Sequence, residues 1–203
     1  MFDNEDENFE RDISKDLEKF EKYLKGGNMQ YLDVDRLEAI VDHYLISGQY
    51  NKALFCAEYA LSLFSFEPIF KLRMAQALSA TGKLKDALNV LAGIEQIIGE
   101  ETEWLLTKAS IFSQLKDSKR AIKFFEASLI KAEDEDKDEI FLDLAMEHEN
   151  ANDYKKAIDV LKRAMKHNPS NEGAIYELAY CYDQLNEHES AIKSYTDFID
   201  ENP

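Results

Sequence analysis

The sequence predicts an all-α chain in which pairs of antiparallel helices repeat, and three observations support this prediction. An alanine followed by isoleucine or leucine recurs in steps of 34, 34, 36 and 34 residues, at Ala53, Ala87, Ala121, Ala157 and Ala191. Only seven glycines and three prolines interrupt the 203 residues, which suits a helical chain. No stretch has the alternating apolar and polar pattern of a β-strand.

Other positions repeat with the same period. One column upstream of the alanines holds small residues, at Val41, Ala75, Ala109, Ala145 and Ala179. A second column holds mostly large residues, at Tyr44, Leu78, Phe112, His148 and Tyr182. Small residues let two antiparallel helices approach closely, and large ones fill the space to the next pair. Because one pair cannot bury its apolar face alone, neighbouring pairs must stack.

A turn column separates the two helices of each pair, at Gly48, Gly82, Lys116, Asn152 and Asn186. The spacing predicts first helices over about 34–47, 67–81, 102–115, 138–151 and 172–185. It predicts second helices over about 50–64, 84–98, 118–132, 154–167 and 188–201. The single longer step falls in the charged connector 133–137, where an insertion is easily tolerated.

The N-terminal segment lacks the alanine columns. Residues 1–11 are acidic and poor in apolar residues, so we expect them to be disordered. Apolar residues then follow helical spacing, at Ile13, Leu17, Phe20 and Leu24, and Gly26-Gly27-Asn28 is typical of a helix stop. We therefore expect residues 12–33 to form a capping helix and a connector over the first repeated pair.

The repeated columns resemble those of the tetratricopeptide repeat family, whose unit is a helix-turn-helix of about 34 residues. The resemblance covers five units, over residues 34–67, 68–101, 102–137, 138–171 and 172–203. The last two units match best, with FLDLAMEHENANDYKKAIDVL and YELAYCYDQLNEHESAIKSY, each followed by a closing Asn-Pro. The resemblance implies a right-handed α-solenoid, or superhelix. Lys108 in an aliphatic column, and Gly99 and Glu133 in place of the closing proline, depart from the family pattern.

Composition restricts the kind of partner. There are 41 acidic and 24 basic side chains, which give a net charge of −17. This charge argues against binding to nucleic acid or to anionic membranes. It permits a basic protein partner, although an acidic surface also serves solubility alone.

The positions of the two cysteines and the sequence of the N-terminus indicate the cellular compartment. Cys56 and Cys181 lie in distant units, so we expect two small buried residues in a reducing compartment, without a disulfide. The first residues have neither the basic start nor the apolar run of a signal peptide. No apolar stretch is long enough to span a bilayer. The expected location is therefore the cytoplasm.

No group of residues indicates catalysis. The four histidines fall in different units, and we expect His148, in the large-residue column, to be a packing residue. The acidic run 134–138 lacks the glycine and the distal glutamate of a calcium loop, and Gly26-Gly27-Asn28 lacks the following lysine of a phosphate loop. Glu38 and Asp42 lie four residues apart, which we interpret as paired surface acids. We expect no enzymatic activity, no cofactor and no metal.

The family resemblance implies that the first helices line a concave groove for a peptide or a helical segment. The predicted groove residues lie opposite the small-residue column: Glu38, Asp42, Leu72, Gln76, Leu106, Ser110, Leu142, Met146, Glu149, Tyr176, Tyr180 and Asp183. Chaperone-adaptor members of the family clamp a C-terminal carboxylate with Lys, Arg and Asn at these places. This sequence has other residues there, so we expect no such clamp.

The predicted groove is apolar in its middle and acidic at its ends. This pattern predicts a protein or peptide partner that is apolar with basic flanks. Leu72, Leu106 and Leu142 can equally pack between helices. Tyr176 and Tyr180 are the stronger candidates, because exposed aromatic residues commonly anchor interfaces.

The sequence thus predicts a non-catalytic protein-protein interaction module or scaffold. Two alternatives remain open: a self-associating assembly segment, and the non-catalytic arm of a longer multi-repeat protein. Both depend on the last predicted helix, after which no polar capping helix follows. We expect Tyr195, Phe198 and Ile199 to leave apolar surface open there, either because the array is a fragment or because this face self-associates.

Overall fold

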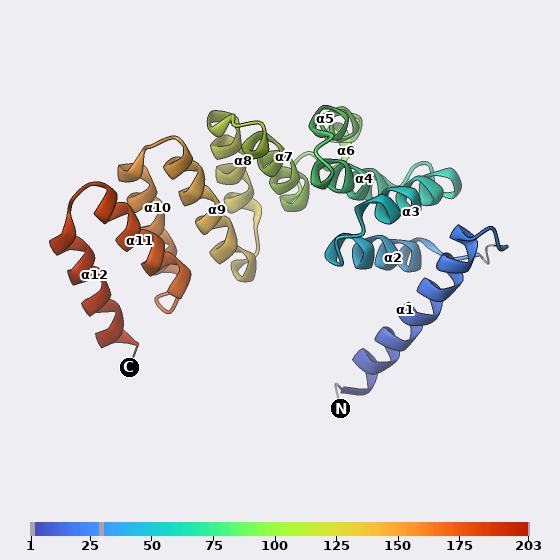
Figure 1. Cartoon of the computed structure of the whole chain (residues 1–203), viewed down its shortest axis with the longest axis horizontal. Helices are drawn as coiled ribbons and strands as arrows, with labels where there is room; N and C mark the ends of the chain where they lie inside the picture. Colours follow the sequence, from blue (N-terminus) through green and yellow to red (C-terminus); the bar gives the residue numbers. More distant parts are fainter. Residues whose placement is uncertain (1–2, 29–30, 203) are drawn as a thin grey trace. The chain divides into compact units, whose positions relative to one another are not determined.

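The computed structural model describes residues 3–28 and 31–202 (Figure 1). Within these residues it contains twelve α-helices and one short 3-10 helix, and no strand. The chain divides into two compact units, Met1–Ile98 and Gly99–Pro203, each of which is built from helix pairs.

The N-terminal unit contains α1 (Asp3–Leu24), α2 (Val34–Ile46), α3 (Tyr50–Leu63), α4 (Pro68–Ala80), α5 (Leu84–Ala92) and α6 (Glu95–Ile98). From α1 to α5, each helix packs against the next, and α2 also contacts α4. The core of this unit includes the fully buried side chains of Leu37, Ile40, Val41, Ala53, Ala57 and Ala60.

The C-terminal unit contains α7 (Thr102–Gln114), α8 (Ser118–Lys131), η1 (Asp134–Asp136), α9 (Lys137–Asn150), α10 (Tyr154–His167), α11 (Glu172–Gln184) and α12 (His188–Glu201). Each α-helix packs against the next, and α9 also contacts α11. In Figure 1 the helices from α9 to α12, coloured from yellow to red, lie side by side in chain order. First helices therefore stack on first helices within this unit.

The helix positions predicted from the repeat period are confirmed to within a residue, with one exception. The predicted helix 84–98 is interrupted, because α5 ends at Ala92 and α6 begins at Glu95. Gly93 caps α5. Glycine has a low helix propensity, since its backbone loses the most freedom on folding.

The start of the chain differs from expectation. Residues 3–11, which we expected to be disordered, belong to α1. The segment contains neither glycine nor proline and continues without a break into the predicted helix, so nothing local ends the helix before Gly26. Met1 and Phe2, and residues 29 and 30 of the expected connector, lie outside the described residues.

The predicted helix stop and the predicted cap are both present in α1. Gly26 has a φ of 90°, and its N–H donates to the carbonyl of Tyr23 at 2.9 Å. Phe20 is fully buried. Its ring centroid lies 6.2 Å from that of Tyr44 on α2 and 6.3 Å from that of Phe55 on α3. An aromatic contact thus holds α1 against the first repeated pair.

The alanine columns lie in the interior. Ala53, Ala87, Ala121 and Ala157 have no exposed surface, and only Ala191, on the last helix, is partly exposed. The small residues of the first helices are also buried, at Val41, Ala75, Ala109, Ala145 and Ala179. The absence of a long side chain at these positions lets the helix backbones come close together.

The turn column has a single backbone conformation. All five of its residues have positive φ angles, between 57° and 76°: Gly48, Gly82, Lys116, Asn152 and Asn186. Glycine adopts this left-handed conformation without strain, and asparagine tolerates it. The repeat therefore fixes the geometry of the turn, and Lys116 is the residue least suited to it.

Lys108 is accommodated by aromatic rings. Its ammonium lies 4.2 Å from the ring centroid of Trp104 and 4.9 Å from that of Phe124. A cation over an aromatic face is attracted by the ring quadrupole. This contact explains how a lysine fits a column that is otherwise aliphatic.

Ala157→Phe should destabilise the chain by about 1–3 kcal/mol, because a phenyl ring must fit between two helices that are in contact. Chemical denaturation followed by circular dichroism measures the change. Ala151→Phe, at the exposed end of α9, is the control and should alter the free energy of unfolding by less than about 0.5 kcal/mol. An unchanged midpoint for Ala157→Phe would contradict the predicted register.

Lys116→Gly should stabilise the chain by about 0.5–1 kcal/mol. The reason is that a left-handed conformation costs a residue with a Cβ about 1–2 kcal/mol, of which the greater backbone freedom of unfolded glycine cancels a part. The same denaturation experiment applies. Lys119→Gly, in the first turn of α8, should instead destabilise, and a loss of stability in both variants would argue against strain at Lys116.

Candidate functional site

In the N-terminal unit the polar residues of the predicted groove contact Arg73, which was not among the predicted residues. Arg73 on α4 is only 11% exposed, and its guanidinium lies 3.0 Å from the Glu38 carboxylate and 2.6 Å from that of Asp42 on α2. It also lies 3.4 Å from the Gln76 side-chain oxygen. The two acids that we expected to meet a basic partner thus already pair with a basic residue of this chain.

Arg73 is a residue that the sequence analysis missed. A signal was present, because a basic residue follows Leu72 one repeat after two acids on the neighbouring first helix. Leu72 itself is 1% exposed. Its expected place in a groove is therefore corrected, and of the two roles considered for it, packing between helices is the one observed.

In the C-terminal unit three large apolar or aromatic residues of the predicted groove are exposed. Tyr176 and Tyr180 lie one turn apart on α11 and are 60% and 46% exposed, and Met146 on α9 is 54% exposed. α9 and α11 are in contact. Large apolar side chains at this level of exposure offer surface to a partner. We call these three residues the tyrosine face.

Each of the two tyrosines packs against a tyrosine of a second helix. The ring centroid of Tyr180 lies 6.4 Å from that of Tyr154 on α10, at an interplanar angle of 74°. The centroid of Tyr176 lies 6.0 Å from that of Tyr195 on α12, at 65°. Edge-to-face contacts of this kind restrict ring motion, so less conformational entropy is lost when a partner binds.

The predicted groove leucines of this unit are only partly exposed, and one of them packs between helices. Leu106 and Leu142 are half-buried, and Ser110 is exposed. A methyl of Leu142 lies 2.9 Å from where a Cβ on Gly173 would stand, so Leu142 on α9 occupies the space that this glycine leaves on α11. This contact joins the two helices beneath the tyrosine face.

Two acids lie beside the tyrosine face. Glu149 on α9 accepts a hydrogen bond from the buried thiol of Cys181 on α11, at 3.3 Å. Burial raises the pKa of the Glu149 carboxyl above its ordinary value and raises that of the Cys181 thiol as well. Asp183 is exposed, and its carboxylate lies 3.0 Å from a ring nitrogen of His188. Negative charge therefore borders the apolar surface.

Polar contacts between consecutive first helices recur at one place in the repeat. Ser113 on α7 donates to the carboxylate of Glu147 on α9, a side chain that is 3% exposed. The contact between Glu149 and Cys181 occupies the equivalent positions one repeat later in the sequence. Both cysteines are buried, as predicted, and the hydrogen bond of Cys181 was not expected.

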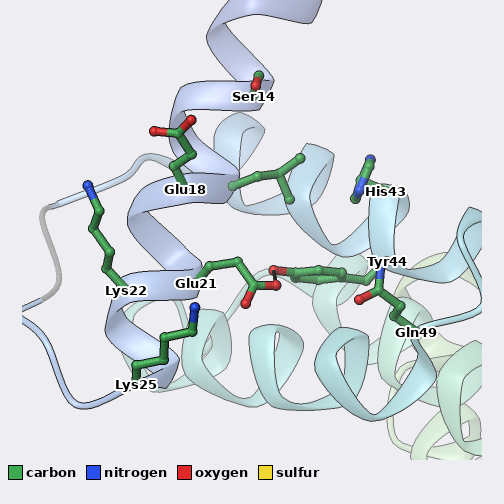
Figure 2. Close-up of a pocket in the computed structure, with 9 residues that line it drawn as sticks. Ser14, Glu18, Glu21, Lys22, Lys25, His43, Tyr44 and Gln49 are labelled. Carbon is green, nitrogen blue, oxygen red and sulfur yellow. Dashed lines mark hydrogen bonds between the residues drawn. The ribbon is translucent and has the colours of Figure 1, made fainter.

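A pocket of about 430 Å³ opens between α1 and α2 in the N-terminal unit (Figure 2). Its wall includes Glu21, which accepts a hydrogen bond from the Tyr44 hydroxyl at 2.9 Å and pairs with Lys52. The Lys52 ammonium holds the pKa of Glu21 below its ordinary value. Lys22 and Lys25 also line the pocket. Glu21 thus links α1 to Tyr44 on α2 and to Lys52 on α3. The pocket wall carries charges of both signs, which select no single class of ligand.

No helix in the described ranges 3–28 and 31–202 combines the length and the apolar character that a membrane span requires.

His148→Phe should make stability less sensitive to acid. Burial holds the pKa of His148 below its ordinary value of 6.5. Below that pH the unfolded chain therefore binds a proton that the folded chain does not, so stability falls as the pH drops from 7 to 5. Phenylalanine fits the column, as Phe112 shows, and does not titrate.

The measurement is the free energy of unfolding of both chains at several pH values. The difference, variant minus parent, should rise as the pH falls below 6.5. His167→Phe, which replaces an exposed histidine, is the comparison. A difference that stays constant with pH would contradict the buried neutral state of His148.

Comparison with known proteins agrees with this architecture. Residues 105–129 and 150–197 match models of the tetratricopeptide repeat. No curated protein sequence shows significant similarity to the chain. Among solved structures, a crystal structure of MamA is similar with a TM-score of 0.66 at 14% identity, over 84% of this chain and 95% of that one.

Two further MamA structures are similar. The structure named "MamA 41-end from Desulfovibrio magneticus RS-1" gives a TM-score of 0.67 at 17% identity, over 81% of this chain and 92% of that one. The structure named "MamA MSR-1 C2" gives 0.62 at 16% identity, over 82% and 97%. At such identities the likeness establishes the fold, while the repeat matches establish the family of the repeats. The chain thus contains tetratricopeptide repeats, over residues 105–129 and 150–197, within an all-α helical array.

Proposed function

We propose that the chain is a non-catalytic protein-binding module, and that the tyrosine face of its C-terminal unit binds an apolar or helical segment flanked by basic residues. The observation that carries this proposal is the exposure of Met146, Tyr176 and Tyr180 on two first helices that are in contact. Tyrosine and methionine are both enriched at protein interfaces.

Geometry supports a helical or extended segment as the partner. Tyr176 and Tyr180 project from the same face of α11, since they are four residues apart. Met146 extends that surface onto α9. An amphipathic helix laid across the two helices would place apolar side chains one turn apart against it. The support that Tyr154 and Tyr195 give to the tyrosines keeps this surface in shape before binding.

Charge supports basic flanks. Glu149 and Asp183 border the tyrosine face, and the whole chain carries a net charge of −17. Such a surface attracts cationic segments during encounter and disfavours acidic ones. We leave Glu38, Asp42, Leu72 and Gln76 out of the proposed binding surface, because Arg73 occupies the polar ones and Leu72 is buried.

A displayed library of random peptides selected on the full chain tests the proposal. The selected peptides should be rich in apolar residues with Lys or Arg on either side. Tyr180→Ala should weaken a selected peptide tenfold or more, as the loss of an interface anchor worth about 2 kcal/mol does. It should lower the free energy of unfolding by no more than about 1.5 kcal/mol, the upper value of its ring contact with Tyr154.

The matched control is Tyr31→Ala, which removes a tyrosine that is 76% exposed in the N-terminal unit. It should leave peptide binding unchanged. Equal losses of binding and stability in Tyr180→Ala would assign this residue to the core. Selected peptides that bind all these variants alike would place the binding surface elsewhere.

A further inference from the structure

Charge is distributed unevenly over the helices of the C-terminal unit. The second helices α8 and α10 together carry nine lysines and arginines but only two acids. The first helices α9 and α11 carry one lysine and eight acids. The whole chain has a net charge of −17. Because basic residues reduce the net charge that keeps such a chain soluble, solubility does not explain why they gather on α8 and α10.

The repeat does not require this basic character. The second helices α3 and α5 of the N-terminal unit each carry one lysine and one acid, and α12 carries one lysine and four acids. Lys155 and Lys162 on α10 are replaced by Glu189 and Thr196 at the equivalent positions of α12. The concentration of basic residues is therefore specific to α8 and α10.

About half of these basic side chains are not neutralised by the chain itself. Ion pairs form at Arg120, Lys131, Lys156 and Arg163. The pair of Arg163 on α10 with Glu126 on α8, at 3.1 Å, shows that the exposed sides of the two helices meet. The other five, which we call the basic surface, are exposed and form no ion pair with any residue that the structure describes: Lys119, Lys123, Lys155, Lys162 and Lys166.

Aromatic rings restrict two lysines of the basic surface. The Lys162 ammonium lies 5.6 Å from the ring centroid of Tyr182, and the Lys123 ammonium lies 5.9 Å from that of Phe124. A cation at such a distance is attracted to the face of the ring. The two ammonium groups thus have preferred positions before a partner arrives, so less side-chain entropy is lost on binding.

We propose that the basic surface binds an acidic α-helix of another protein. This inference goes beyond the proposed function, because the tyrosine face lies on α9 and α11 and suits a partner of the opposite charge. The chain would then hold two different partners, one on the first helices and one on the second helices of the same unit.

The spacing of the lysines favours a helix as the partner. Lys155, Lys162 and Lys166 follow i, i+7 and i+11 spacing, so they form one stripe about 16 Å long on α10. A helix that runs along α10 with glutamate or aspartate at the same intervals meets all three. Ile130 on α8 is 80% exposed and is the repeat equivalent of Lys166. An apolar residue on the partner helix can cover it.

Nucleic acid and anionic membranes are less suitable occupants. α10 has 14 residues and is about 21 Å long. The exposed acidic run 133–136 follows α8 directly. An extended polyanion that reaches beyond the two helices meets these acids, and the net charge of the chain repels it. A helix as short as α10 avoids this repulsion.

The acidic helices of a second copy of the chain are also less suitable. α9 and α11 pack against other helices of their own unit, so neither can lie along α10 as a free helix does. Several of their acids are occupied as well. Glu147 is 3% exposed, and Glu149 accepts a hydrogen bond from Cys181. A separate acidic helix is therefore the partner that the basic surface fits.

A displayed library of single helices, selected on the full chain carrying Tyr180→Ala, tests the proposal. This background removes the anchor of the tyrosine face, so that failure here is distinct from failure there. The selected helices should carry acids on one face at the intervals of the lysine stripe. Lys162→Glu should weaken a fluorescent, stapled copy of such a helix by about fivefold or more, measured by anisotropy, because it replaces an attraction by a repulsion. A helix with lysine in place of the facing acid should bind Lys162→Glu better than it binds the parent.

The matched control is Lys85→Glu, which changes the net charge by the same amount at an exposed lysine of α5, the repeat equivalent of Lys119. It should leave the affinity unchanged. Selected helices without an excess of acids, or equal losses in Lys85→Glu and Lys162→Glu, would overturn the proposal. So would duplex DNA or phosphatidylserine vesicles that displace the selected helix from the parent chain. A dimer of the parent chain that Lys162→Glu dissociates would identify a second copy as the occupant and would overturn it too.

Discussion

The close approach of helices at the buried alanines is the constraint on which this structure depends. Ala53, Ala87, Ala121 and Ala157 have no exposed surface, so at these positions each second helix places nothing larger than a methyl group in the interior. The apolar residues on the remaining faces are then left for the neighbouring pair to cover. Stability in such an array is shared between pairs, because no pair completes its own core.

Stacking also brings polar side chains of consecutive first helices into contact, and the chemistry of these contacts differs along the chain. Arg73 lies between Glu38 and Asp42 in the N-terminal unit, while Ser113 meets Glu147 and Cys181 meets Glu149 in the C-terminal unit. Buried polar groups lose their water and must find partners. These contacts therefore favour one register of stacking over alternatives in which the same groups would remain unpaired.

The predicted groove residues fall into two groups, those that stabilise the fold and those that are available to a partner. Where polar groove residues already pair within the chain, as Glu38 and Asp42 do with Arg73, their charges are no longer available to a partner. Where large apolar side chains remain exposed and are braced by second helices, as at Tyr176 and Tyr180, the surface suits binding. Equivalent positions in a repeat thus serve different purposes, because the residues that meet them on the next helix differ.

The sequence by itself determined the repeat, the helix positions and the places of the turns, because each depends on local spacing. The left-handed conformation of the turns was found in the structure. The repeat pattern predicted neither the helix break at Gly93 nor the helical start of the chain. Both depend on the helix propensities of a few residues, which the spacing of apolar residues does not report. Only the tertiary structure decided which of the predicted groove residues are exposed. The burial of Leu72 and the pairing of Arg73 depend on what the neighbouring helices place opposite them, and that is a property of the packing between helix pairs.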